Sequence, residues 1–257
     1  MKIVALGTGT SQGVPVIGCK CEVCSNRHEE DIRTRSSIYI ESESAKVLID
    51  IGPDFRAQFL SNNLQTLDLV LVTHEHNDHI IGLDDIRAIN FIQKKSVPFY
   101  MQQRVLDEIK LRFDYVFKGS KYPGLPQIQL HAVENKPIEY KDLVITPISI
   151  QHGRLPILGY RINNMAYITD ASHIPDSEWS KLEDLDVLII NALRKTAHHS
   201  HFTLSEALDA TSRIAAKRTF ITHVSHLMGP TSQWRQELPP SVSPLQDKMI
   251  IHTSIND

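Results

Sequence analysis

The segment HEHNDH, residues 74–79, places three histidines and an aspartate within six positions. It follows directly after a short apolar run that predicts a buried strand. On the extended end of such a strand His74 and His76 share one face, and two neutral imidazoles there suit a borderline cation such as zinc. Asp78 and His79 follow where the chain turns toward a helix, so they point elsewhere. Their spacing favours a second metal ion beside the first.

All three cysteines of the chain lie within six residues, at Cys19, Cys21 and Cys24. An odd number of cysteines so closely spaced is a poor disulfide framework, whereas three thiolates supply three of the four ligands of a closed tetrahedral zinc site. His226, three residues after His223, can supply the fourth ligand. The sequence therefore predicts a structural zinc that ties the N-terminal loop to the segment around His223.

Short apolar and β-branched runs predict the strands that must position these side chains. The predicted strands are Lys2–Leu6, Ser37–Glu41, Lys46–Asp50, Asp68–Val72, Val97–Met101, Leu143–Ile150, Ile157–Ile162, Ala166–Thr169, Val187–Ile190 and Arg218–Thr222. The predicted helices are Pro53–Ser61, Leu83–Phe91, Arg104–Tyr115, Asp176–Leu182 and Leu204–Ala215, the last with a capping box at Thr203 and Glu206. With strands in both halves, the simplest architecture is a single α/β domain of two central sheets flanked by helices.

The composition is that of an ordinary globular protein, with 41% hydrophobic residues, 22% charged residues and a formal net charge of −3 over 257 residues. No apolar run approaches the roughly 20 residues that span a bilayer, and the first residues lack the pattern of a signal peptide. We therefore expect a cytoplasmic protein without a membrane partner. The absence of a long basic run argues against nucleic acid as the main partner but leaves room for a small anionic substrate.

The pattern HEHNDH matches the HxHxDH signature of the metallo-β-lactamase superfamily, and later residues resemble its further ligands in the expected order. His152, Asp170 in the stretch TDAS, and His223 each follow a predicted strand. The resemblance covers nearly the whole chain. It implies the αββα four-layer sandwich of that superfamily, as a single domain over residues 1–257, with the site at the mouth between the sheets.

The same resemblance implies a site for two divalent metal ions, zinc or manganese. Its ligands fall into two sets with a bridge: His74, His76 and His152 for one ion, Asp78, His79 and His223 for the other, and Asp170 between them. Each ion would keep an open position, as a catalytic site requires. A water molecule shared between two cations can lose its proton near neutral pH, which would give a bridging hydroxide as the nucleophile.

Within the superfamily, the N-terminal CxCxxC motif and the HxSH motif at the last ligand resemble the PhnP-type phosphodiesterases, which hydrolyse phosphoribosyl cyclic phosphate. The implied activity is hydrolysis of a small cyclic phosphodiester. By the same resemblance, His201 in HHSHFTLSEAL is the general acid that protonates the leaving alkoxide. The neighbouring His198 and His199 leave that assignment open, and His198 is also a candidate for orienting the substrate. Arg35 and Arg194 are candidates for binding phosphate, because guanidinium groups suit its oxygens.

Other activities remain alternatives. A glyoxalase-type thioesterase would normally add a C-terminal helical domain, for which few residues follow His223. An RNA-processing nuclease would carry a long substrate-gripping arm, whereas the Gly/Pro-rich loop 118–126 is short. A non-hydrolytic accessory protein of the PqqB kind shares the N-terminal Cys motif, but binding alone does not need seven ligands around an open site. The family also makes a homodimer plausible.

Overall fold

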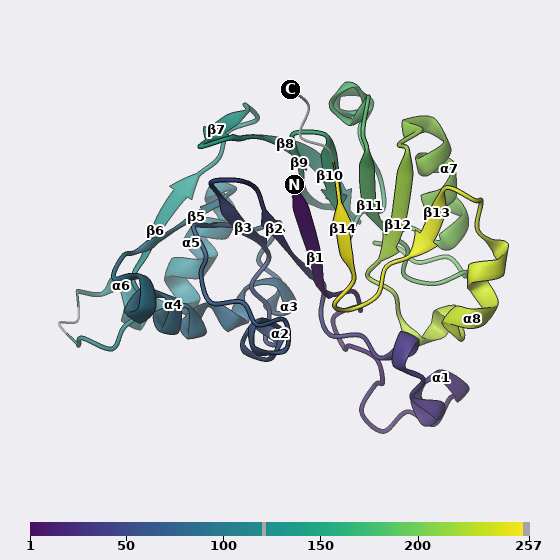
Figure 1. The fold of residues 1–257 in the computed structure, drawn as a ribbon, viewed down its shortest axis with the longest axis horizontal. Coiled ribbons are helices and arrows are strands. Elements are labelled where there is room, and N and C mark those ends of the chain that lie inside the picture. Colours follow the sequence, from purple (N-terminus) through teal and green to yellow (C-terminus); the bar gives the residue numbers. More distant parts are fainter. Residues whose placement is uncertain (120–121, 254–257) are drawn as a thin grey trace.

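The apolar runs of the sequence fold into two mixed β-sheets (Figure 1). The computed structural model describes residues 1–119 and 122–253, and within these residues each sheet has seven strands. In spatial order, the first sheet consists of β14 (Ile250–His252), β1 (Lys2–Gly7), β2 (Ser37–Glu41), β3 (Lys46–Ile49), β4 (Leu69–Leu71), β5 (Val97–Met101) and β6 (Ile128–Ala132). The second consists of β13 (Val242–Pro244), β12 (Arg218–Thr222), β11 (Val187–Asn191), β10 (Met165–Ile168), β9 (Leu155–Ile162), β8 (Leu143–His152) and β7 (Ile138–Tyr140).

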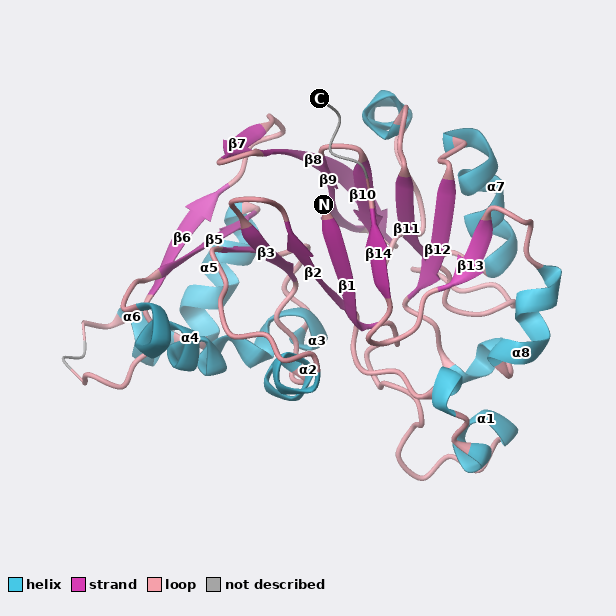
Figure 2. Cartoon of the chain, in the orientation of Figure 1, coloured by secondary structure: helices cyan, strands magenta, loops and turns pink. Residues whose placement is uncertain are grey.

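Helices cover the outer face of each sheet, which gives four layers (Figure 2). The α-helices are α1 (Glu22–Asn26), α2 (Phe55–Ser61), α3 (Asn77–Ile80), α4 (Ile86–Gln93), α5 (Gln103–Arg112), α6 (Asp114–Phe117), α7 (Leu204–Ile214) and α8 (Thr231–Trp234). Shorter 3₁₀ helices are Glu29–Asp31, Ile81–Asp85, Asp176–Leu182, His226–Met228 and Arg235–Glu237. Helices α2, α4 and α5 pack on the first sheet, and α7 and α8 pack on the second.

The apolar core is divided among the three interfaces between these layers. Ile40, Leu71 and Ile189 belong to the cluster between the sheets. Phe59 of α2 packs into the cluster on the first sheet, and Trp234 of α8 packs into the cluster on the second. Removal of this apolar surface from water favours the layered arrangement. The predicted αββα sandwich is confirmed.

The strands that precede the predicted site residues run in the same direction within each sheet. In the first sheet β3 and β4 are parallel, and in the second β10, β11 and β12 are parallel. Strand β8 shares their direction, because β8 and β10 are both antiparallel to β9. In α/β sheets ligands bind beyond the carboxyl ends of the strands. The fold therefore gathers the residues after these strands at two facing sheet edges.

Three residues within two positions of these strand ends have left-handed backbone conformations that non-glycine residues seldom adopt. Asp50 has φ of 64°, Asp170 of 58° and His223 of 55°. Such conformations cost of order 1–3 kcal/mol each and cluster at functional sites. The close approach of neighbouring segments adds a further constraint, because a Cβ on Gly52 would lie 2.1 Å from the carbonyl oxygen of Asp78.

The predicted strands all form, each with ends within two residues of the prediction, but several helices differ. Residues 176–182 form a 3₁₀ helix, and the predicted helix 104–115 is divided into α5 and α6. Residues 120–121 of the predicted loop 118–126 lie outside the described residues. Among residues 1–119 and 122–253, no helix has the length and hydropathy needed to cross a membrane.

Candidate metal centre

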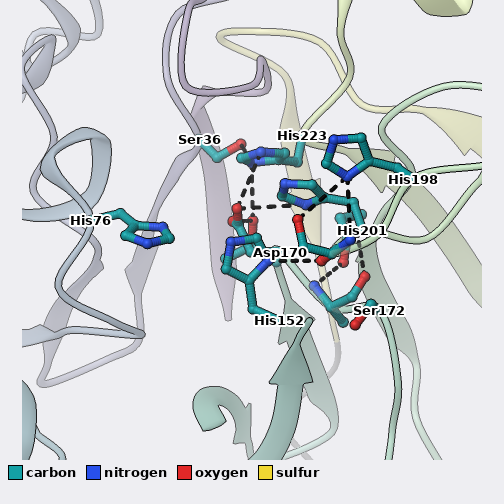
Figure 3. Close-up of polar contacts among 12 residues, drawn as sticks. Ser36, His76, His152, Asp170, Ser172, His198, His201 and His223 are labelled. Carbon is teal, nitrogen blue, oxygen red and sulfur yellow. Dashed lines mark hydrogen bonds and ion pairs between the residues drawn. The ribbon is translucent and has the colours of Figure 1, made fainter. Parts of the chain in front are cut away.

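The seven side chains predicted as metal ligands come together from both sheets. Four of them follow β4, and the others follow or end strands of the second sheet: His74, His76, Asp78, His79, His152, Asp170 and His223. In Figure 3, His152, His201 and His223 surround Asp170, with His76 on the side of the first sheet. The structure thus converts residues spread over half of the sequence into one cluster.

His74, His76 and His152 form the first predicted set, and their ligand atoms lie within 4.8 Å of one another. Nε2 of His74 is 2.9 Å from Nδ1 of His76. Burial holds the pKa of His74 well below its usual value, and the charge of His79 acts in the same direction. The His74 imidazole is therefore neutral and can offer a lone pair to a cation.

His79 and Asp170 belong to the second set. Nε2 of His79 lies 3.1 Å from Oδ2 of Asp78 and 3.3 Å from Oδ2 of Asp170, while Nε2 of His223 lies 3.2 Å from Oδ1 of Asp170. Burial opposes ionisation of Asp170, but the charges of His223 and His79 hold its pKa well below the ordinary range. Asp170 also groups with the ligand atoms of His74 and His79. It therefore lies between the two sets, where a bridging ligand belongs.

In His152 and His223, the ring nitrogen that faces away from the centre contacts a partner outside it. Nδ1 of His152 is 2.7 Å from the carbonyl oxygen of Ser200, so that nitrogen donates a hydrogen bond. Nδ1 of His223 lies 3.2 Å from the Ser36 hydroxyl. Such outer contacts fix the orientation of an imidazole and direct its other nitrogen at a metal position.

Asp50 is a residue of the site that sequence reasoning misses. Its fully buried carboxylate accepts hydrogen bonds from the Thr73 backbone at 2.8 Å, the Thr73 hydroxyl at 2.9 Å and Nδ1 of His79 at 2.7 Å. Nε2 of His79 is consequently aimed at the centre. One signal in the sequence was available, because KVLIDIG (46–52) and MAYITDA (165–171) both end a strand in Asp.

The loop before α7 brings His201 into the centre. Its ring centroid lies 4.6 Å from that of His152 and 5.0 Å from that of His223. Burial lowers the pKa of His201 to about 3, and the charge of His223 contributes. The free side chain is therefore neutral at pH 7. His198 lies further out, with its ring 5.0 Å from His201, and His199 is exposed.

The two arginines predicted to bind phosphate already contact the protein itself. Arg35 pairs with Asp54 at 3.1 Å and donates a hydrogen bond to the Ser11 carbonyl. Arg194 donates hydrogen bonds to the carbonyl oxygens of residues 196 and 197. Binding phosphate would require either guanidinium to share or exchange these partners.

A cavity of about 590 Å³ opens beside the first set of histidines. Its lining includes His76, His152, Arg154 and His199. Arg154 is exposed in the turn between β8 and β9, and its guanidinium makes no hydrogen bond or ion pair with any described residue. This guanidinium was not predicted as a site residue, because its place beside the cavity depends on how the β8–β9 hairpin meets loop 198–201.

The three cysteines and His226 form a second cluster of ligand type, with atoms within 4.8 Å of one another. Nδ1 of His226 lies 3.3 Å from the sulfurs of Cys19 and Cys21. Ligands about 2.3 and 2.0 Å from a tetrahedral zinc would be about 3.5 Å apart, so the arrangement fits zinc. The hydrogen bond with His226 lowers the pKa of Cys21 to about 6, whereas burial raises that of Cys24 to about 11.

The residues of the His/Asp centre also fit divalent cations. Nε2 of His79 is buried and has no hydrogen bond within the described residues, although it faces two carboxylate oxygens. A buried polar atom without a partner carries a free-energy cost, which a cation between the nitrogen and the oxygens would remove. Imidazole and carboxylate donors suit zinc and manganese alike.

A family profile described as "Beta-lactamase superfamily domain" matches residues 45–224. The chain belongs to the metallo-β-lactamase superfamily. The matched range begins at β3 and ends just after His223, so it includes all seven converging ligand-type residues and excludes the cysteines. The predicted superfamily is confirmed.

Similarity to solved structures indicates the branch of the superfamily to which this chain belongs. The crystal structure of a diphosphatase from the PhnP family is 35% identical, with a TM-score of 0.92 over 99% of this chain and 98% of that one. This similarity confirms the predicted PhnP-type branch. Zinc-bound PqqB from Methylobacterium extorquens, at 17% identity and a TM-score of 0.81 over 98% and 100% of the two chains, shares the fold.

A third relative carries a different activity in its name. The Octanoyltransferase of Porphyromonas gingivalis is 42% identical over 245 residues, which cover 94% of this chain and 49% of that protein. The chain thus spans about half the length of this relative. The chain thus has the metallo-β-lactamase fold, a diphosphatase of the PhnP family among its neighbours, and His/Asp clusters of the kind that hold divalent metals.

Proposed function

We propose that this protein hydrolyses small phosphodiesters with two divalent cations bound by the seven converging side chains. The observation that carries the proposal is the convergence of five imidazoles and two carboxylates from both sheets on one centre. When bound, such a pair of cations lowers the pKa of a water molecule and balances the negative charge of the phosphate. A zinc bound by the three cysteines and His226 would be structural.

Residues around the proposed cations orient the histidine ligands, and one of them donates a proton to the leaving group. Asp50 fixes the tautomer of His79, and Ser200 fixes that of His152. Water forms the new phosphorus–oxygen bond and releases a proton to solvent, while the bond to the leaving oxygen breaks and His201 donates a proton to that oxygen. Because the pKa of the free His201 is about 3, the anionic substrate must raise that pKa before the transfer.

The cavity beside His76 and His152 accommodates the rest of the substrate. Arg154, which no described residue engages, binds an anionic oxygen there, while Arg35 and Arg194 act only if they exchange their present partners. We therefore expect Arg154→Ala to raise KM for an anionic substrate several-fold while kcat changes little. The cavity size fits a small molecule, so nucleic acid is not part of this proposal.

A diphosphate linkage is the second candidate substrate. It is favoured by the 35% identity to the PhnP-family diphosphatase over 99% of this chain. Both substrates undergo attack by water at a tetrahedral phosphorus, and they differ in the leaving group. A phosphate leaving group needs less help from a proton donor than an alkoxide, so the role of His201 distinguishes the two.

Octanoyl transfer is not proposed for this chain. The relative with that name is about twice as long, and the match covers 49% of it. The three cysteines of this chain all belong to the Cys₃His cluster, so no thiol remains to carry an acyl group at the His/Asp centre.

The test is turnover by metal-loaded protein with bis-p-nitrophenyl phosphate, 2′,3′-cyclic nucleotides, phosphoribosyl cyclic phosphate, a dinucleoside diphosphate, lactoylglutathione and an octanoyl ester. We expect phosphodiester or diphosphate hydrolysis that disappears with chelator and returns with zinc or manganese. Hydrolysis of the thioester alone would contradict the proposal. No hydrolysis of any of them with both metals bound would favour a binding role of the PqqB kind.

A further inference from the structure

Arg104, the second residue of α5, joins two parts of the chain that are remote in sequence. One of its Nη atoms pairs with the carboxylate of Glu75. The other donates a hydrogen bond to the carbonyl oxygen of Pro156 at 2.7 Å. Glu75 is only 13% exposed, and its second oxygen is buried without a hydrogen bond among the described residues. Arg104 is thus the cation that balances this carboxylate.

Both parts carry residues of the first ligand set. Glu75 lies between His74 and His76, and its side chain points away from theirs because neighbouring side chains alternate along an extended segment. Pro156 pairs with Gln151 in the β8–β9 hairpin, next to His152. The guanidinium of Arg104 therefore spans from the ligand segment of the first sheet to the ligand hairpin of the second.

Two neighbouring contacts show what Arg104 adds. Deeper in the fold, the Leu158 backbone donates to the Thr73 carbonyl oxygen at 3.1 Å and joins the same two segments. Arg112, also on α5, donates to the Glu75 carbonyl oxygen at 2.6 Å and to the Asn77 side chain at 2.9 Å, so it contacts the first segment alone. Arg104 is the side chain of α5 that links the segments.

We propose that Arg104 is a positioning residue that sets the separation of His74 and His76 from His152, and thereby the affinity of that metal position. This inference rests on the proposed metal pair. The other position depends on different outer contacts, since His79 is oriented by Asp50. Loss of Arg104 therefore weakens one metal position and leaves the other close to its original affinity.

The test compares metal-loaded wild-type protein with Arg104→Gln, dialysed against buffers of increasing chelator strength, with the metal per chain measured by mass spectrometry. We expect one metal of Arg104→Gln to be lost at about 10-fold higher free metal than in the wild type. This is the low end of the effect of removing a direct outer partner of a ligand, because Arg104 acts on the ligands through Glu75 and the Pro156 carbonyl oxygen. The remaining metals should shift less than about threefold. Anomalous scattering from partly loaded crystals would locate the loss at His74, His76 and His152.

Three further measurements separate positioning from a general loss of structure. With saturating metal, kcat of Arg104→Gln should return to within about threefold of wild type, which a misfolded protein would not do. Arg104→Lys keeps a positive charge beside Glu75. A single ammonium group cannot contact both the Glu75 carboxylate and the Pro156 carbonyl oxygen as the guanidinium does, so the metal affinity of this variant should be intermediate. Lys110→Gln is the matched control, because Lys110 is an exposed basic residue of the same helix; its metal affinity should equal that of wild type.

The outcomes distinguish this inference from the function on which it rests. Wild-type protein that retains no metal at the His/Asp centre would overturn both. Wild-type protein with two metals there, and Arg104→Gln with the same chelator profile, would overturn the role of Arg104 alone. Equal weakening of both positions would also overturn it, since the effect would then not be selective.

Discussion

At the scale of single residues, the centre depends on imidazoles in which one nitrogen faces the centre and the other contacts an outer residue. One nitrogen of His79, His152 or His223 points inward, while the other contacts Asp50, Ser200 or Ser36. A histidine without its outer contact can rotate or change tautomer, and it then binds a cation less well. The outer residues therefore matter to metal binding although they do not touch the metal position.

Asp50→Asn tests this role of outer contacts. Asparagine matches aspartate in shape and tolerates the left-handed backbone at this position, but its amide cannot accept the His79 hydrogen bond as a charged partner. We expect about 10–100-fold weaker binding of one metal, measured by competition with a chelator. Asp209→Asn, at an exposed site on α7, is the control. Wild-type affinity in Asp50→Asn would show that His79 does not need this carboxylate.

His201→Ala tests the proton donor. Its removal should lower turnover of a substrate with an alkoxide leaving group by ~10²–10⁴-fold, the usual contribution of general acid catalysis. Turnover of bis-p-nitrophenyl phosphate should fall far less, because nitrophenolate leaves without a proton. The measurement is kcat/KM for both substrates in both proteins. Equal losses would remove His201 from the role of acid, and His198→Ala is the matched comparison.

At the scale of secondary-structure elements, the apolar strands were predictable and the short edge elements were not. Strands such as β3 and β12 are rich in β-branched residues and bounded by turns, so their sequences alone define them. Strands β7 and β13 have three residues each, and β13 ends in proline. Their pairing is decided by the neighbouring strand of the sheet, which is long-range information absent from a local sequence window.

The same division applies to the candidate site. Residues 74–79 form a local motif, and the later ligands could be assigned through family resemblance. Asp50 and Arg154 were not predicted. The parallel between KVLIDIG and MAYITDA marks Asp50 only as the end of a strand, because its role depends on a contact 29 residues away, and the role of Arg154 depends on the placement of a cavity. The spacing of residues in the sequence can predict ligands that lie on one segment. Outer contacts and cavities arise only when segments pack together.

The capping box of α7 is an element whose contribution can be measured. The Thr203 hydroxyl accepts the backbone N–H of Glu206 at 3.2 Å, and the Glu206 carboxylate accepts the backbone N–H of Thr203 at 2.8 Å. Thr203→Ala should lower the free energy of unfolding by about 1 kcal/mol in urea titrations. Ser212→Ala, on the exposed face of the same helix, should change it by less than about half of that. A free energy of unfolding that Thr203→Ala leaves unchanged would mean that the box adds no stability.

At the scale of the whole molecule, each cluster of metal-ligand type joins parts of the chain that are remote in sequence. The His/Asp centre has ligands from both sheets, and the Cys₃His cluster joins residues 19–24 to the segment after β12. Neither cluster can form until residues remote in sequence have packed. Binding of the proposed metal ions would therefore be coupled to completion of the fold.

In protein freed of metal by chelator, the thiols of the second cluster should differ in reactivity. The pKa of Cys21 is lowered to about 6, so its reactive thiolate is present above that pH and disappears as the pH falls below it. The raised pKa of Cys24, about 11, keeps that buried thiol protonated through neutral pH. Iodoacetamide labelling followed by peptide mass spectrometry should show Cys21 modified first at pH 7, with a midpoint near pH 6. Faster labelling of Cys24 would contradict this order.

The most direct measurement is an anomalous difference map from crystals of the protein loaded with zinc or manganese. We expect two peaks at the His/Asp centre, one beside His74, His76 and His152 and one beside Asp78, His79 and His223, with Asp170 between them. Zinc crystals should show a further peak at the Cys₃His cluster. A His/Asp centre without a peak, in crystals soaked with excess cation, would contradict the proposal that this protein is a metal-dependent hydrolase.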